Sequence, residues 1–116
     1  MKQPIYISGK ISGLDIDEVY QKFQKTEDKL RNMGYTEIIN PMKNISMETI
    51  KMTRTTKQDY EFWCRCMIQD IESLFKCNAI YMQKGWTSSV GAKIELFIAD
   101  SIRLKNTKCG FDITYE

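Results

Sequence analysis

The chain has 116 residues, of which 42% are hydrophobic, and this is enough for one compact domain with a substantial core. A net charge of +2, with the basic residues spread along the chain, is too small to indicate a nucleic-acid polymer as partner. No apolar run approaches the ~18 residues that a membrane span needs, and the N-terminal run is too short for a signal peptide. We therefore predict a single cytoplasmic domain over residues 1–116 with no membrane partner.

Histidine is absent from the sequence, which excludes Ser-His-Asp and Cys-His sites and removes the commonest metal ligand. The four cysteines form no C-x-x-C pair, so neither a zinc ribbon nor a thioredoxin-like redox site is indicated. Reduced, mostly buried thiols in a cytosolic protein are the simplest interpretation. We expect no metal site.

The N-terminal segment predicts a strand followed by a glycine-containing turn. Residues 4–8 are apolar and β-prone, and they read as a central strand that ends at Gly9. Residues 9–13 then place two glycines around a basic and a hydroxyl residue. Such a turn can bring backbone amides and Lys10 toward a phosphate. An ordinary strand-to-helix connection explains the same residues equally well.

A helix and a second short strand follow this turn. Asp15 or Asp17 caps the helix, and Gly34 is suited to the position just after its end. The apolar stripe of this helix consists of Val19, Phe23, Thr26, Leu30 and Met33. Residues 35–40 predict the second strand, which Pro41 stops.

The middle of the chain predicts a loop and then a long helix. Residues 41–57 lack a clean period and indicate a loop with a short helix, which covers the site or joins a subunit contact. Residues 58–76 predict a helix with the stripe Tyr60, Trp63, Met67, Ile71 and Leu74. Asp70 lies at the edge of that stripe and needs partners or a wet cavity, because an unpaired buried carboxylate is costly. A capping or loop-anchoring hydrogen bond is the open alternative.

The C-terminal part continues the alternation of strand and helix. Residues 77–82 predict a third strand, a helix runs to about Lys105, and residues 107–113 predict a last strand. The residues of this helix that fall at helical spacing are Val90, Ile94, Phe97, Ser101 and Leu104. Helices between strands predict a parallel sheet covered on both faces. We expect a Rossmann-like (flavodoxin-like) three-layer α/β sandwich with four or five strands.

The junction before the last helix combines a carboxylate with a rim suited to anions. The side chain of Glu95 leans toward Gly91 and Ala92, which leaves a hollow beside it. Ser88 or Ser89 serves as N-cap, and the free amides of the first turn favour an anion nearby. Open parallel sheets bind ligands at such junctions. The spacing also allows a solvated glutamate on an ordinary capped helix, although no lysine or arginine lies three or four residues from Glu95.

Three motifs in the chain occur together in one known family. They are Tyr6-Ile7-Ser8-Gly9-Lys10-Ile11-Ser12-Gly13, Asp70, and Gly85-Trp86-Thr87-Ser88-Ser89-Val90-Gly91-Ala92-Lys93-Ile94-Glu95. This set resembles the nucleoside 2-deoxyribosyltransferase superfamily over nearly the whole chain. The pattern is most similar to a branch of small bacterial and phage proteins with a Tyr-Ile-Ser-Gly start and a Gly-Trp-x-x-Ser-x-Gly-Ala-x-x-Glu block.

The resemblance implies a role for each acidic residue of these motifs. Characterised members cleave the N-glycosidic bond of 2-deoxynucleosides or their monophosphates, with the glutamate at the position of Glu95 as nucleophile. Tyr6 matches the tyrosine that orients this glutamate. Asp70 matches the aspartate that helps to hold and protonate the departing base. The chemistry needs neither a metal nor an organic cofactor, and its partner is a small nucleotide or nucleoside.

Within the superfamily, the resemblance is closest to the deoxynucleoside monophosphate N-glycosidases. These enzymes have a phosphate-binding serine six residues before the nucleophile, where this chain has Ser89. The first turn matches at its glycines and at Ile11, whereas Lys10 and Ser12 replace a serine and an arginine that hold phosphate. The residues implied in substrate or phosphate binding are Gly9, Lys10, Ile11, Ser12, Gly13, Ser88, Ser89 and Gly91. Trp86 is implied in the base pocket or as a lid.

We therefore expect cleavage of the N-glycosidic bond of a nucleotide, with a 2-deoxynucleoside 5′-monophosphate as the first candidate. Two other functions stay open. One is a nucleotide-binding or sensing module without turnover, since fold does not determine function. The other is an interaction protein that uses Trp63, Trp86 and residues 41–57 as its contact surface. The resemblance and the Met- and aromatic-rich helices also predict a homo-oligomer, a dimer or larger.

Overall fold

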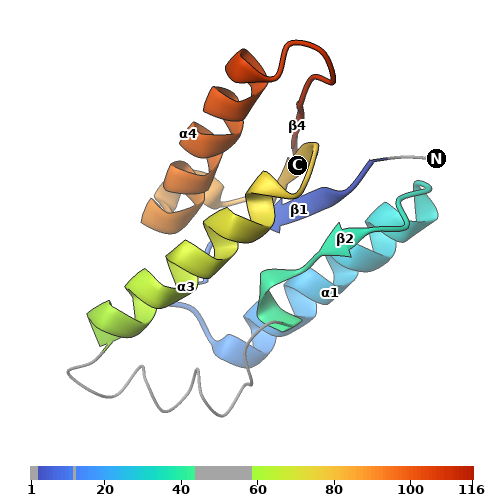
Figure 1. Cartoon of the computed structure of the whole chain (residues 1–116). Coiled ribbons are helices and arrows are strands. Elements are labelled where there is room, and N and C mark those ends of the chain that lie inside the picture. The colour runs from blue at the N-terminus through green and yellow to red at the C-terminus, as the bar shows by residue number, and fades with distance from the viewer. Residues whose placement is uncertain (1–2, 12, 44–58) are drawn as a thin grey trace.

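The computed structural model describes residues 3–11, 13–43 and 59–116 (Figure 1). The strands are β1 (Ile5–Ser8), β2 (Ile38–Ile39), β3 (Ala79–Met82) and β4 (Asp112–Tyr115), and the helices are α1 (Ile16–Asn32), α3 (Asp59–Phe75) and α4 (Val90–Lys105). All strands pair in parallel, in the order β2-β1-β3-β4. This arrangement confirms the predicted Rossmann-like α/β fold with a four-stranded sheet.

The sheet separates two apolar cores, because successive strand residues point to opposite faces. On one face, Ile5 and Ile7 of β1 pack with Val19, Phe23 and Leu30 of α1. On the other face, Tyr6 and the β3 residues Ile80 and Met82 pack with residues of α3 and α4. The helix residues in this second core are Leu74, Ala92 and Ala99. The molecule therefore has three layers, with α1 on one side of the sheet and α3 and α4 on the other.

The chain changes direction between the two central strands, β1 and β3, and this makes their carboxyl ends a candidate binding position. From β1 the chain crosses through α1 to β2 on one side, and from β3 it crosses through α4 to β4 on the other. The last residues of these neighbouring strands, Ser8 and Met82, lie directly opposite each other in the ladder. Ligands bind at this kind of switch point in open parallel sheets.

The predicted helix ends agree with the structure. The side chain of Asp15 caps α1 by accepting a hydrogen bond from the backbone N–H of Glu18 at 3.2 Å. Gly34, just beyond the end of α1, has a positive φ of 102°, which glycine adopts without steric cost. Of the two serines proposed as N-cap of α4, Ser89 fills the position and accepts from the N–H of Ala92 at 3.1 Å.

The helical spacing read for α4 is confirmed, but three of the residues that carry it, Val90, Phe97 and Leu104, are exposed. The buried residues of this helix are Ala92, Glu95 and Ala99. The apolar period marked one side of the helix correctly, but small side chains let the opposite side approach the sheet. The structure corrects two smaller predictions as well, since Met33 and Tyr60, taken as members of buried stripes, are exposed.

The second strand and the loop after it also differ from expectation or lie outside the description. Only Ile38–Ile39 of the predicted residues 35–40 form a strand, since β2 is an edge strand whose partner β1 pairs with it at two positions. Pro41–Lys43 form a single 3₁₀ turn. The rest of the predicted loop with a short helix, residues 44–57, lies outside the described residues.

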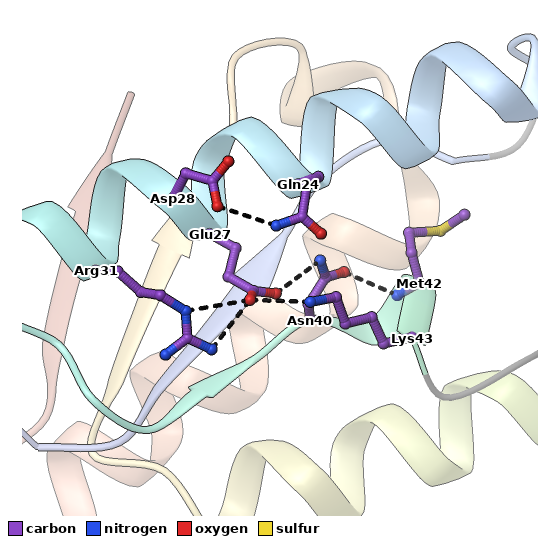
Figure 2. A network of polar contacts seen from close by, with 7 residues as sticks. All are labelled: Gln24, Glu27, Asp28, Arg31, Asn40, Met42 and Lys43. Atoms are coloured by element: carbon purple, nitrogen blue, oxygen red, sulfur yellow. Dashed lines mark hydrogen bonds and ion pairs between the residues drawn. The ribbon is translucent and has the colours of Figure 1, made fainter.

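A buried ionic cluster fastens this 3₁₀ turn to α1 (Figure 2). Glu27 of α1 is buried, and its Oε2 accepts from Arg31 Nη2 and from Lys43 Nζ, each at 3.0 Å. Its Oε1 accepts from Asn40 Nδ2 at 3.2 Å, and Asn40 Oδ1 accepts from the N–H of Met42 at 3.0 Å. Burial opposes ionisation of Glu27, but the hydrogen bonds from Lys43, Arg31 and Asn40 outweigh it and lower its pKa. The cluster therefore holds Pro41–Lys43 in place, and sequence reasoning had not predicted these contacts of Glu27.

Candidate functional site

Two hydroxyl groups of β1 hold the carboxylate of Glu95. Tyr6 and Ser8 lie two positions apart on the strand, so both side chains point to the face that α4 covers. The Tyr6 hydroxyl donates to Glu95 Oε2 at 2.6 Å, and the Ser8 hydroxyl donates to Oε1 at 2.6 Å. Glu95 is only 5% exposed. This geometry excludes a solvated surface glutamate and gives the carboxylate one defined orientation.

Asp70 of α3 completes a cluster of buried acidic groups. Burial and, to a smaller extent, the charge of Glu95 raise its pKa to about 8, against the lowering effect of the Tyr6 hydroxyl. Burial also raises the pKa of Glu95 to about 7, against the lowering effect of the bonds from Ser8 and Tyr6. The pKa of Tyr6 itself lies well above its ordinary value because of burial and the nearby charge of Glu95. Near neutral pH the cluster therefore holds a protonated Asp70 beside a Glu95 that can ionise.

A cavity of about 480 Å³ opens over these two carboxyl groups. Its volume lies in the range of small-molecule sites. Asp70 and Glu95 line it from α3 and α4, and Gly9, Lys10 and Ile11 line it from the turn after β1. The remaining lining residues are Pro41, Met42, Tyr60, Phe62, Trp63, Cys66, Met67, Ser88, Ser89, Val90, Gly91 and Ala92. The cavity is thus apolar on most of its wall, with two carboxyl groups together at one place.

The rim of the cavity near α4 is suited to an anion. Ser88, Ser89 and Gly91 lie at the start of this helix, where unpaired N–H groups and the helix dipole favour negative charge. Lys10 lines the same cavity from the turn after β1 and supplies a positive charge. The rim thus offers a place for an anion that is separate from the acidic cluster.

Close packing beneath the turn explains why Gly9 has no side chain. A Cβ atom at this position would come within 2.5 Å of Gln83 Nε2 and 3.1 Å of Gln83 Cβ. Gln83 is fully buried, and its Oε1 accepts from the Thr26 hydroxyl of α1 at 2.5 Å. The turn therefore rests directly on the side chain that follows β3, which brings its backbone to the cavity.

The structure brings together most residues that the sequence indicated. Glu95, Asp70, Gly9, Lys10, Ile11, Ser88, Ser89 and Gly91 line the cavity, and Tyr6 lies beneath it bonded to Glu95. Gly13 lies in the turn before α1 with a φ of 81° and is not among the lining residues. Trp86 packs against Tyr115 of β4, with ring centroids 5.7 Å apart, rather than on the described cavity wall. Ser12 lies outside the described residues.

Sequence reasoning missed two parts of the site. Ser8 was part of a quoted motif but had no assigned role, although its place two residues after Tyr6 on a strand puts it on the same face. The second part is an aromatic wall at the start of α3, made by Tyr60, Phe62 and Trp63. No sequence signal distinguishes a tryptophan on a cavity wall from one in the core, since both continue the same apolar stripe.

Comparison with known proteins places the chain in one family. The model of the family described as Domain of unknown function (DUF4406) matches residues 3–107, and the chain belongs to this family. No curated protein and no solved structure matches the chain.

Within the parts of the chain that the structure describes, no three Asp, Glu or Cys side chains cluster as metal ligands. The same parts contain no helix of the length and apolarity that crossing a bilayer demands.

Proposed function

We propose that this member of the DUF4406 family cleaves the N-glycosidic bond of a nucleotide, with Glu95 as nucleophile. The observation that carries the proposal is the pair of carboxyl groups at the cavity floor. Tyr6 and Ser8 orient the carboxylate of Glu95, and the raised pKa keeps a proton on Asp70 at neutral pH. A carboxylate and a carboxylic acid on one small-molecule cavity are the two groups that glycosidic cleavage with a covalent intermediate requires.

The proposed reaction has two steps, formation of a glycosyl ester of Glu95 and its hydrolysis. In the first, a Glu95 oxygen attacks the anomeric carbon, the carbon–nitrogen bond breaks, and the departing base takes the proton of Asp70. A glycosyl ester of Glu95 and the carboxylate of Asp70 remain. In the second, Asp70 accepts a proton from a water whose oxygen attacks the anomeric carbon, and the ester bond breaks to restore Glu95. A second base in place of water gives transfer instead of hydrolysis.

The substrate we propose is a 2-deoxynucleoside 5′-monophosphate. A phosphate at the start of α4 is favoured by the helix N-terminus, Ser89 and Lys10. The aromatic wall of Tyr60, Phe62 and Trp63 offers flat apolar surface to a base. The proposal includes a cytoplasmic setting, because Cys64, Cys66, Cys77 and Cys109 are all free thiols, as in reducing compartments. It also includes assembly into a homo-oligomer.

The test is release of free base from a panel of deoxynucleoside and ribonucleoside monophosphates and the matching nucleosides, followed by chromatography. We expect release from a deoxynucleoside monophosphate, and a loss of at least ~10³-fold in Glu95→Ala. Glu18→Ala removes an exposed glutamate of α1 and is the matched control. The proposal is refuted if no substrate releases free base, or if Glu95→Ala releases base as fast as the wild type.

One observation favours a second candidate, a nucleotide-binding module without turnover. Each oxygen of the Glu95 carboxylate already accepts a hydrogen bond, from Tyr6 and from Ser8, which lowers its nucleophilicity. Thermal stabilisation by a deoxynucleoside monophosphate without base release would support this function over catalysis.

A further inference from the structure

Part of the cavity wall is connected to the helix on the other side of the sheet. Pro41 and Met42, in the 3₁₀ turn after β2, line the cavity. Met42 is only 2% exposed and belongs to the core that α1 covers. Phe62 of α3 also lines the cavity and packs against that core. The position of this part of the wall therefore depends on what holds the turn to α1.

Glu27 of α1 holds the turn through two separate contacts (Figure 2). Its Oε2 accepts from Lys43 Nζ at 3.0 Å, and its Oε1 accepts from Asn40 Nδ2 at 3.2 Å. The Oδ1 of Asn40 then accepts from the backbone N–H of Met42 at 3.0 Å. Hydrogen bonds thus run from α1 to a residue of the cavity wall.

Stability alone does not account for a charged group at this place. A buried ion pair adds little net stability over apolar residues of similar size, because the desolvation of the charges offsets their attraction. Hydrogen bonds depend on direction, however, and apolar contacts do not. The buried carboxylate of Glu27 receives donors from α1 and from the turn, so it defines where the turn lies relative to the helix.

Glu27, Asn40 and Lys43 are not among the described residues that line the cavity. We propose that these three are positioning residues, which set the affinity of the cavity for its ligand by holding Pro41 and Met42 in the wall. If the wall is complete for only about a tenth of the time, the apparent affinity falls about tenfold. The effect on the substrate rests on the proposed function, whereas the placement of the turn does not.

A matched pair of substitutions separates this role from general stabilisation. Arg31 Nη2 and Lys43 Nζ both lie 3.0 Å from Glu27 Oε2, and their side chains are 51% and 44% exposed. Arg31 belongs to α1 itself, so of these two residues only Lys43 connects Glu27 to the turn. Lys43→Ala and Arg31→Ala therefore remove similar contacts with different consequences. Asn40→Ala breaks the second connection, so the test stands if Lys43→Ala fails to fold.

Amide hydrogen exchange followed by NMR tests the placement of the turn without a ligand. The backbone N–H of residue 43 donates to the carbonyl oxygen of Asn40 at 3.0 Å, a bond between backbone atoms that each variant retains. After correction for intrinsic rates, this N–H should exchange at least ~5-fold faster in Lys43→Ala and in Asn40→Ala, because the turn opens more often. In Arg31→Ala it should stay within ~2-fold of the wild type.

The kinetics of base release test the consequence for a deoxynucleoside monophosphate. KM should rise about 5-fold in Lys43→Ala and about 10-fold in Asn40→Ala, whose side chain is more deeply buried. The kcat should stay within ~2-fold, because the substitutions leave both carboxyl groups of the cavity in place. Lys43→Arg keeps a cationic donor and should keep the wild-type KM. A variant that is merely less stable loses kcat through a smaller folded fraction and keeps its KM.

Three results are decisive against the positioning role. Exchange at residue 43 that is unchanged in Lys43→Ala and Asn40→Ala would overturn it, and so would exchange that Arg31→Ala accelerates equally. Faster exchange with an unchanged KM would overturn it as well. If the wild type releases no base from any substrate, the proposed function fails, and the exchange rates by themselves decide whether these residues position the wall.

Discussion

We expect the free energy of unfolding to fall as the pH rises from 5 toward 7, because Glu95 and Asp70 bind protons more tightly in the folded protein. Burial raises the pKa of Glu95 from 4.5 to about 7 and that of Asp70 from 3.8 to about 8. A raised carboxyl pKa contributes its full stability below the unfolded value, and this is lost as the pH rises through the folded value. The sign is opposite to that of Glu27, whose lowered pKa makes acid destabilising.

The size of this fall in the free energy of unfolding follows from the number of protons that the protein releases when it unfolds. Between pH 5 and about 6.5, Glu95 and Asp70 are mostly protonated in the folded protein and mostly ionised in the unfolded chain. Each then lowers the free energy of unfolding by about 1.4 kcal/mol per pH unit. Over this interval of about 1.5 units the pair accounts for ~4 kcal/mol. Glu95→Gln removes one titrating group, so about half of this pH dependence, ~2 kcal/mol, remains.

Urea unfolding at a series of pH values and one fixed protein concentration measures this effect. Tryptophan fluorescence can report it, since the chain has two tryptophans. The chain has no histidine, so no imidazole titrates in the chosen window. Glu18→Gln, an exposed glutamate of α1, is the control and should keep the wild-type slope. Wild-type stability that is flat or rising across this window, or an unchanged slope in Glu95→Gln, would refute the reasoning.

Two further substitutions probe hydrogen bonds that sequence reasoning missed. Ser8→Ala removes a 2.6 Å bond to Glu95 and should raise its pKa by about one unit or more, since such bonds are worth ~1.5–3 kcal/mol. NMR titration of the Glu95 carboxyl carbon checks this, and an unchanged pKa contradicts it. Glu27→Gln weakens the contacts to Arg31 and Lys43 and should cost about 1–2 kcal/mol in urea unfolding, because both partners are partly exposed and screened. Glu18→Gln is the surface control for this substitution. If the cost of Glu27→Gln lies within ~0.5 kcal/mol of the cost of Glu18→Gln, the prediction is contradicted.

Local patterns in the sequence sufficed for the elements, their order and most helix ends. Alternating strands and helices predict a parallel sheet because parallel strands need a crossover between them. Asp15 and Ser89 cap their helices through bonds to residues three positions away, which a short stretch of sequence contains. The hollow beside Glu95 follows in the same way from Gly91 and Ala92, one turn before it. Each of these features depends on residues close together in the chain.

Only the tertiary structure decided which side of α4 faces the sheet and what Glu95 contacts. The apolar residues Val90, Phe97 and Leu104 mark one side of this helix, yet the helix buries the opposite side, where Ala92 and Ala99 allow close approach to the strands. Burial of Glu95 is then tolerated because Tyr6 and Ser8, 89 and 87 positions earlier, donate to both of its oxygens. The period of a pattern tells which residues share a face. Which face turns inward depends on partners that are distant in sequence and meet only when the sheet forms.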